Sequence, residues 1–142
     1  MEEKSKVILI ADVDDENVEL LSSVFIKEGY MVDRAKRVSQ VLEKIQTSQV
    51  DVLILDVEMP GMKGYEIIPV IKRINNKIPI IMTSIDNSLE LAKRVREAGV
   101  FFYIIKPLDI EEIKLVVRDA FRKIGKRNKG THNLYGRINA YS

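Results

Sequence analysis

The chain has 142 residues, of which 46% are hydrophobic and 31% are charged, a composition typical of one globular domain large enough to bury a core. It contains no cysteine and one histidine, His132, which excludes disulfide frameworks, thiolate zinc sites and most histidine-based metal or triad chemistry. No apolar run approaches the length of a membrane span and the charged N-terminus is unlike a signal sequence, so a cytoplasmic protein without membrane contact is expected.

The net charge of +2 is distributed unevenly along the chain. Residues 1–117 carry 16 Lys/Arg and 20 Asp/Glu, whereas residues 118–142 carry seven Lys/Arg and one acid. Residues 125–142 also lack a clear hydrophobic period, so we interpret 1–124 as the folded domain and 125–142 as a basic linker or tail. Such a tail could contact nucleic acid or acidic lipid, but the sequence contains no DNA-binding motif.

Short apolar runs and stretches of helical periodicity alternate along residues 7–124. The runs that predict strands are 7–11, 31–35, 52–55, 78–82 and 101–105, with 31–35 expected near a sheet edge because two charged residues interrupt it. Apolar residues three and four positions apart predict helices over 15–28, 38–45, 67–74, 91–98 and 110–124. Pro69 indicates that the third helix begins late or kinks, and Asp109 is expected to cap the fifth. Residues 58–64 are expected to form a loop.

This alternation predicts the α/β class, in which right-handed crossovers place helices on both faces of a parallel sheet. Sites in open parallel sheets form at the carboxyl ends of the strands. The polar residues at those ends are Asp12, Asp14, Asp56, Thr83, Ser84 and Lys106.

Ionising several carboxylates that lie close together costs free energy, because their negative charges repel one another unless a cation is present. Mg²⁺ is the natural occupant of such an oxygen-rich pocket. Lys106 would supply further positive charge, and a hydroxyl at the end of the fourth strand could donate to an anion. A carboxylate nucleophile can accept a phosphoryl group when cations neutralise charge on its oxygens. The pattern therefore favours phosphoryl transfer onto an aspartate, although each residue alone would more often be an ordinary cap, turn or core residue.

The sequence resembles the receiver domains of two-component response regulators over about residues 5–124. The resemblance rests on residues 8–12, on 51–64 (DVLILDVEMPGMKG), on 79–84 (PIIMTS), and on Ala98-Gly99 followed by 103–107 (YIIKP). It implies a flavodoxin-like, doubly wound (βα)5 fold with five parallel strands in the order 2-1-3-4-5. It also implies a cis peptide bond before Pro107.

Carried over residue by residue, Asp56 resembles the phosphorylated aspartate of the family, and the backbone carbonyl of Glu58 resembles a metal ligand. Ser84 aligns with the switch hydroxyl that reaches toward the phosphoryl group, Lys106 with the lysine that pairs with it, and Tyr103 with an aromatic side chain that turns inward on activation. The resemblance implies a Mg²⁺-assisted phosphoryl acceptor with, at most, slow self-dephosphorylation, and not an enzyme acting on a separate substrate.

Two positions depart from the family pattern. Receivers usually end the first strand in two adjacent acids, of which the second binds the metal directly, but here Asp12 is followed by Val13. Either Asp14 supplies the missing ligand, or the loop is shifted by one residue, or metal binding is weakened. Ile85 stands where relatives carry a small residue, and its branched side chain could restrict access to Asp56.

The resemblance implies a sensor histidine kinase or phosphotransfer protein as the phosphoryl donor. It also implies a signalling face made by the fourth helix, fifth strand and fifth helix, which could form a homodimer, and allows for an output domain after Ser142. One alternative, based on Val13, is a pseudo-receiver that docks partners without phosphorylation. A second starts from the Asp12-Val13-Asp14 motif, which resembles the nucleophile motif of haloacid-dehalogenase-type phosphatases, although Glu16 does not fit it. A flavin-binding module is less favoured, because acids follow the first strand.

Overall fold

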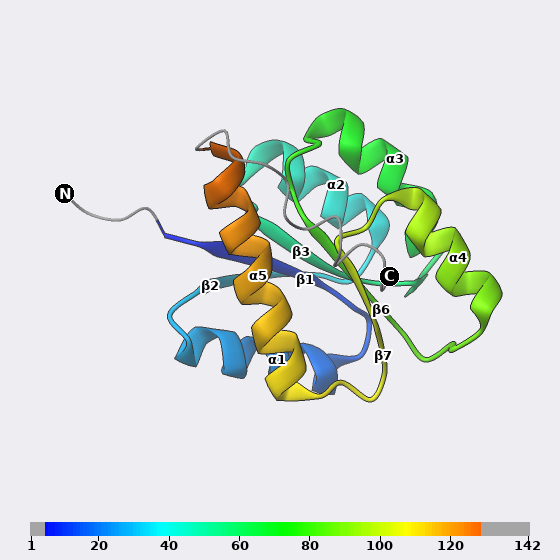
Figure 1. Cartoon of the computed structure of the whole chain (residues 1–142), viewed down its shortest axis with the longest axis horizontal. Helices are drawn as coiled ribbons and strands as arrows, with labels where there is room; N and C mark the ends of the chain where they lie inside the picture. The colour runs from blue at the N-terminus through cyan, green and yellow to red at the C-terminus, as the bar shows by residue number, and fades with distance from the viewer. Residues whose placement is uncertain (1–4, 129–142) are drawn as a thin grey trace.

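The computed structural model describes residues 5–128, which form one parallel sheet with helices on both faces (Figure 1). The strands of this sheet are β1 (Val7–Ala11), β2 (Met31–Ala35), β3 (Val52–Asp56), β6 (Ile80–Ser84) and β7 (Phe102–Ile105). The helices within the same residues are α1 (Asp15–Lys27), α2 (Val38–Thr47), α3 (Gly64–Ile74), α4 (Leu89–Ala98) and α5 (Ile110–Asn128). None of these helices is long and apolar enough to cross a membrane.

The strands lie in the order β2-β1-β3-β6-β7, and every neighbouring pair is parallel. Counted along the chain, this is the predicted order 2-1-3-4-5 of a doubly wound sheet, with the charge-interrupted β2 at one edge as expected. Parallel strands that are covered on both faces need near-continuous apolar sequences. The central strand β3 meets this requirement, because all of its residues are buried.

Two hydrophobic cores separate the sheet from its helices. One core packs Leu9, Leu53 and Met82 against α2, α3 and α4. The other packs Ile10 and Ile54 against α1 and α5. Because alternate residues of a strand point to opposite faces, each strand contributes to both cores.

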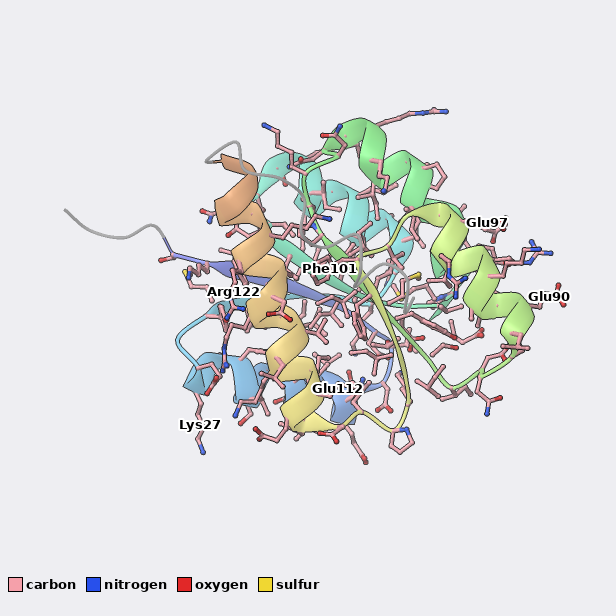
Figure 2. The ribbon with its side chains drawn as sticks, in the orientation of Figure 1. Lys27, Glu90, Glu97, Phe101, Glu112 and Arg122 are labelled. Carbon is pink, nitrogen blue, oxygen red and sulfur yellow. The ribbon has the colours of Figure 1, made fainter. Side chains whose placement is uncertain are left out.

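Charged side chains on the outer surfaces of the helices point away from these cores. Figure 2 shows this for Lys27 of α1 and for Glu90 and Glu97 of α4, all of which are exposed.

The structure differs from the sequence-based expectations at three places. Residues 58–64 are not a plain loop, because β4 (Glu58–Met59) and β5 (Met62–Lys63) pair as an antiparallel hairpin. Helix α3 does not begin late: it starts at Gly64 and continues through Pro69, which forgoes one intrahelical hydrogen bond, and the alternative of a kink at Pro69 stays a prediction. Helix α5 continues through Asn128, four residues past the predicted domain end. Residues 129–142 of the predicted tail lie outside the described residues, so the division at 124/125 stays a prediction.

The buried hydroxyl group of Ser22 in α1 is expected to lower the stability of the domain. Its side chain is 2% exposed, and its Oγ has no hydrogen-bond partner within residues 5–128. A buried hydroxyl without a partner costs free energy, so Ser22→Ala should raise the free energy of unfolding by about 1 kcal/mol. Urea denaturation measures this change, and Phe25→Ala in the same helix should instead lower it by about 3–5 kcal/mol. A loss of stability in Ser22→Ala would contradict the account.

Gly64 generates a second prediction, because it lies against the end of β3. A Cβ atom at this position would sit 2.6 Å from the backbone oxygen of Asp56 and 2.7 Å from Cε of Met82. Gly64→Ala should therefore lower the free energy of unfolding by about 1–3 kcal/mol. Gly125 of α5 is the matched control: a Cβ there meets nothing within 4 Å, so Gly125→Ala should stabilise the helix by about 1 kcal/mol. Equal effects in the two variants would refute this reading.

Candidate functional site

Polar residues lie together where the parallel strands end, at the side of the sheet formed by the carboxyl ends of the strands. Asp56 is the last residue of β3 and is in register with Thr83 of β6. The amide of Asp12, directly after β1, still donates to a β2 carbonyl at 3.1 Å, and the amide of Lys106, directly after β7, donates to the carbonyl of Ser84 at 2.7 Å. Asp12, Asp56, Ser84 and Lys106 are therefore fixed by the backbone at the carboxyl end of the sheet, as the sequence predicted.

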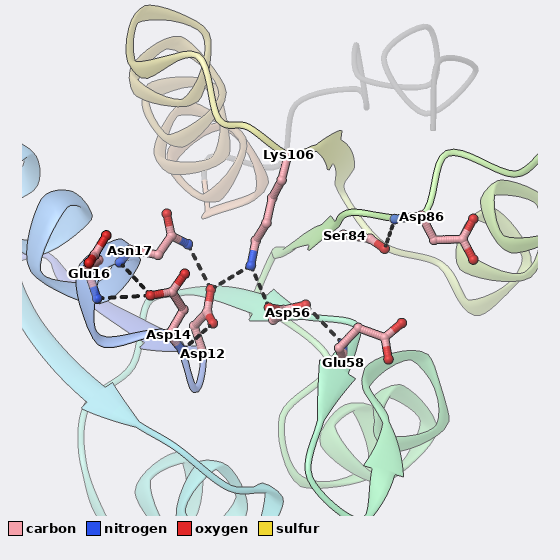
Figure 3. Close-up of polar contacts among 9 residues, drawn as sticks. All are labelled: Asp12, Asp14, Glu16, Asn17, Asp56, Glu58, Ser84, Asp86 and Lys106. Atoms are coloured by element: carbon pink, nitrogen blue, oxygen red, sulfur yellow. Dashed lines mark hydrogen bonds and ion pairs between the residues drawn. The ribbon is translucent and has the colours of Figure 1, made fainter.

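The ammonium group of Lys106 lies between two carboxylates (Figure 3). Its Nζ is 2.6 Å from Oδ2 of Asp56 and 3.0 Å from Oδ2 of Asp12. The two acidic side chains are almost completely buried, and that of Lys106 is 15% exposed. Ion pairs in such an environment are poorly screened by water, so the three groups act as one charged unit with a net charge of −1. The peptide bond from Lys106 to Pro107 is cis, as the resemblance implied.

Backbone and side-chain donors hold both carboxylates in place. Oδ1 of Asp56 accepts a hydrogen bond from the amide of Glu58 at 2.9 Å. Oδ1 of Asp12 accepts from the amide of Asp14 at 2.9 Å, and its Oδ2 accepts from Nδ2 of Asn17 at 2.8 Å. Asn17 was not among the site residues expected from the sequence. The available signal was its position on the first turn of the helix that follows Asp12, which brings its amide back to that carboxylate.

The two carboxylates differ in their affinity for protons. Burial raises the pKa of Asp56, and the charge of Asp12 raises it further, against the hydrogen bonds from Lys106 and Glu58. Burial also acts to raise the pKa of Asp12, but hydrogen bonds from Asp14, Asn17 and Lys106 outweigh it and place the pKa below its usual value. For Lys106, burial acts to lower the pKa, but its bonds to the two carboxylates raise it overall. The side chain of Lys106 therefore stays protonated more readily than an isolated lysine does.

Ser84 and Tyr103 meet at the loop between β6 and α4. Ser84 is completely buried, and its Oγ accepts a hydrogen bond from the amide of Asp86 at 2.9 Å. The hydroxyl of Tyr103 donates to the carbonyl of the same Asp86 at 2.7 Å, and burial raises the pKa of Tyr103. Both expected switch residues thus bind one residue of this loop. Ile85, which lies between Ser84 and Asp86 in the chain, is 74% exposed, so its side chain points into solvent.

The structure does not bring Asp14 to the two buried carboxylates. Its exposed side chain caps α1 instead, and Val13 is 44% exposed. Among residues 5–128, no group of three or more Asp, Glu, His or Cys side chains is arranged to hold a metal ion. The backbone of Glu58 follows Asp56 at the same edge, while its side chain pairs with Nζ of Lys63 at 2.9 Å.

The charged unit predicts a strong dependence of stability on Lys106. Lys106→Met should lower the free energy of unfolding in metal-free buffer by about 3 kcal/mol, because two buried carboxylates lose their counter-charge. Adding Asp56→Asn should restore most of this loss, since one buried carboxylate then remains. Urea denaturation of the two single variants and the double variant tests this coupling. Simple addition of the two single effects would show that the three groups do not act together.

Comparison with known proteins places this geometry in a family. The model of the response regulator receiver domain matches residues 8–118. Sporulation initiation phosphotransferase F of Bacillus subtilis is 36% identical over 104 residues, which are 73% of this chain and 81% of that protein. The DNA-binding transcriptional regulator NtrC of Azospirillum brasilense is 34% identical over 113 residues, which are 80% of this chain.

A solved structure of the beryllofluoride-activated NtrC4 receiver domain dimer matches with a TM-score of 0.79 and 27% identity, over 83% of this chain and 98% of that one. The match to NtrC of Azospirillum brasilense covers 24% of that regulator, so the chain spans about a quarter of its length. The family match, the strand order and the residues at the carboxyl ends of the strands all indicate a receiver domain. The chain therefore belongs to the response regulator receiver domain family, whose members accept a phosphoryl group in two-component signalling.

Proposed function

We propose that Asp56 is the residue of this receiver domain that accepts the phosphoryl group. The observation that carries the proposal is the position of its carboxylate: it is buried at the end of the central strand, 2.6 Å from the Lys106 ammonium and 2.9 Å from the Glu58 amide. These two donors bind negative charge on oxygen, which is what an acyl phosphate and its transition state carry. The pKa of Asp12 is lowered and its carboxylate is held by three donor groups, so Asp12 is a second anionic partner of Lys106 and not the nucleophile in this scheme.

The reaction follows from these contacts. A carboxylate oxygen of Asp56 attacks the phosphorus of a phosphohistidine on the donor protein. The new P–O bond forms as the P–N bond breaks, and the electrons of that bond leave with the imidazole of the donor. Lys106 remains positively charged throughout and neutralises charge on the incoming group. The product is an acyl phosphate on Asp56, so the chain is an acceptor and not a catalyst for a separate substrate.

The donor atoms at this edge fit a divalent cation such as Mg²⁺. Mg²⁺ prefers hard oxygen ligands, keeps several waters, and needs one or two carboxylates from the protein. Asp12, Asp56 and the backbone carbonyl of Glu58 would provide this set. When bound, the cation would stabilise negative charge on the phosphoryl oxygens.

The contacts of Asp86 suggest how phosphorylation is transmitted. In the structure the Oγ of Ser84 is engaged by the Asp86 amide, and Tyr103 is tied to the Asp86 carbonyl. A phosphoryl group on Asp56 offers Ser84 a stronger acceptor, because hydrogen bonds to charged oxygens exceed neutral ones. Turning of Ser84 toward it would release the Asp86 amide, loosen the loop before α4 and free Tyr103 to turn inward. The face made by α4, β7 and α5 would change as a result.

The expected partners remain proposals. A sensor histidine kinase or a phosphotransfer protein would donate the phosphoryl group in the cytoplasm. The matching NtrC4 structure is a dimer of receiver domains, which supports a homodimer of this chain, and the α4-β7-α5 face is the surface proposed for it. An output domain after Ser142 is supported by relatives much longer than this chain. Residues 1–124 would act as the switch and 125–142 as the connection.

A pseudo-receiver remains the second candidate, favoured by one observation: Val13 occupies the position of an acidic ligand. It has the same fold and would dock partners without phosphorylation. The phosphatase hypothesis is no longer favoured, because residues 8–118, which include the Asp12-Val13-Asp14 motif, match the receiver-domain model.

The proposed acceptor can be tested by labelling. Wild-type protein incubated with acetyl phosphate and Mg²⁺ should acquire one base-labile phosphoryl group, and Asp56→Asn should acquire none, because an amide is not a nucleophile for phosphorus. Asp51→Asn, at the opposite end of the same strand, should label like wild type. Full labelling of Asp56→Asn would remove Asp56 from the role, and an unlabelled wild type would favour the pseudo-receiver.

A further inference from the structure

The turn between β1 and α1 contains the departure from the family pattern. Asp12 is followed by Val13, whose hydrocarbon side chain cannot bind a metal ion. Asp14 is the neighbouring acid that could replace the missing ligand. Which role Asp14 has depends on where its carboxylate points.

The Asp14 carboxylate is engaged with the first turn of α1. Its Oδ1 accepts hydrogen bonds from the amides of Glu16 at 3.0 Å and Asn17 at 3.4 Å. The extended backbone of Asp14 (φ −79°, ψ 105°) is that of an N-cap residue, and these two amides have no partner inside the helix. Figure 3 shows the Asp14 carboxylate on the α1 side of the turn, whereas the carboxylate of Asp12 lies toward Lys106.

The same turn fixes Asp12 through the helix that Asp14 caps. The Asp14 amide donates to Oδ1 of Asp12, and Asn17, on the capped turn, donates to Oδ2. If Asp14 swung toward a metal ion, the amides of Glu16 and Asn17 would lose their acceptor. The turn that positions Asn17 against Asp12 would be weakened at the same time. A gain of one ligand would therefore disturb another.

We propose that Asp14 is a helix cap and not a metal ligand, so that the divalent cation of this site is held by two carboxylates, Asp12 and Asp56, with the Glu58 carbonyl. This inference rests on the proposed function of Asp56. A site with fewer charged ligands binds its cation more weakly. Phosphorylation of this chain would then vary with free Mg²⁺ over a range in which a site with three carboxylates is already saturated.

The test is a Mg²⁺ titration followed by the backbone amide signals of Asp12 and Glu58 in ¹H–¹⁵N NMR spectra, together with thermal unfolding. Asp14→Asn is the decisive variant, because asparagine caps helices as well as aspartate but carries no charge; its Mg²⁺ dissociation constant should stay within about twofold of wild type. Asp14→Ala should lower the unfolding midpoint, since it removes the cap.

Val13→Asp restores an acidic side chain at the position where the family has a metal ligand. It should tighten Mg²⁺ binding by about tenfold or more, because it adds a charged oxygen ligand. This gain would support the proposal even if wild-type binding is too weak to measure. Val13→Asn serves as the matched uncharged control and should gain much less.

Two results would overturn the inference: Mg²⁺ binding at least about tenfold weaker in Asp14→Asn, or no gain in Val13→Asp. Neither result depends on phosphorylation, so the acetyl phosphate experiment separately decides whether Asp56 is the acceptor. Labelled Asp56 combined with a weakened Asp14→Asn site would retain the proposed function and reject the role of Asp14 as a cap alone.

Discussion

The ion pairs of Lys106 are the interaction on which the site depends. They join residues that are 50 and 94 positions apart in the chain, and they bring a single ammonium to two buried carboxylates. Such an arrangement is weak evidence for stability, because desolvation offsets most of the attraction between the charges. Its consequence is chemical: a sheet otherwise built from apolar strands carries, at the carboxyl ends of those strands, two buried carboxylates and the ammonium that neutralises part of their charge. The rest of the fold serves to hold this edge together.

Most of the fold could be predicted because its periodicities are long and unambiguous. Buried parallel strands need continuous apolar runs, and covered helices need apolar stripes, so the strand and helix positions follow from the sequence. The exceptions lie where the local structure depends on only a few residues. The hairpin of 58–63 is too short to leave a pattern, and α3 passes through Pro69 because its remaining contacts outweigh one lost hydrogen bond. The periodicity of α5 also fades before its end at Asn128.

Three members of the site were predictable, but its contacts were not, and Asp14 and Asn17 were not placed correctly from the sequence. Parallel strands end at one edge, so the sequence alone brings Asp12, Asp56 and Lys106 together. It does not reveal that Asn17 holds Asp12, because that contact depends on the exact direction of the first turn of α1. It also leaves Asp14 open between ligand and cap, since the difference is one side-chain orientation that neighbouring amides decide.

Chemical location of the phosphoryl group is the most direct test of whether Asp56 carries it. Sodium borohydride reduces an aspartyl phosphate to homoserine, which peptide mapping by mass spectrometry places at a single position. After reaction of the wild-type protein with a phosphorylated donor, the account predicts homoserine at position 56. Homoserine at position 12 or 14, or phosphate found on another residue type, would contradict it.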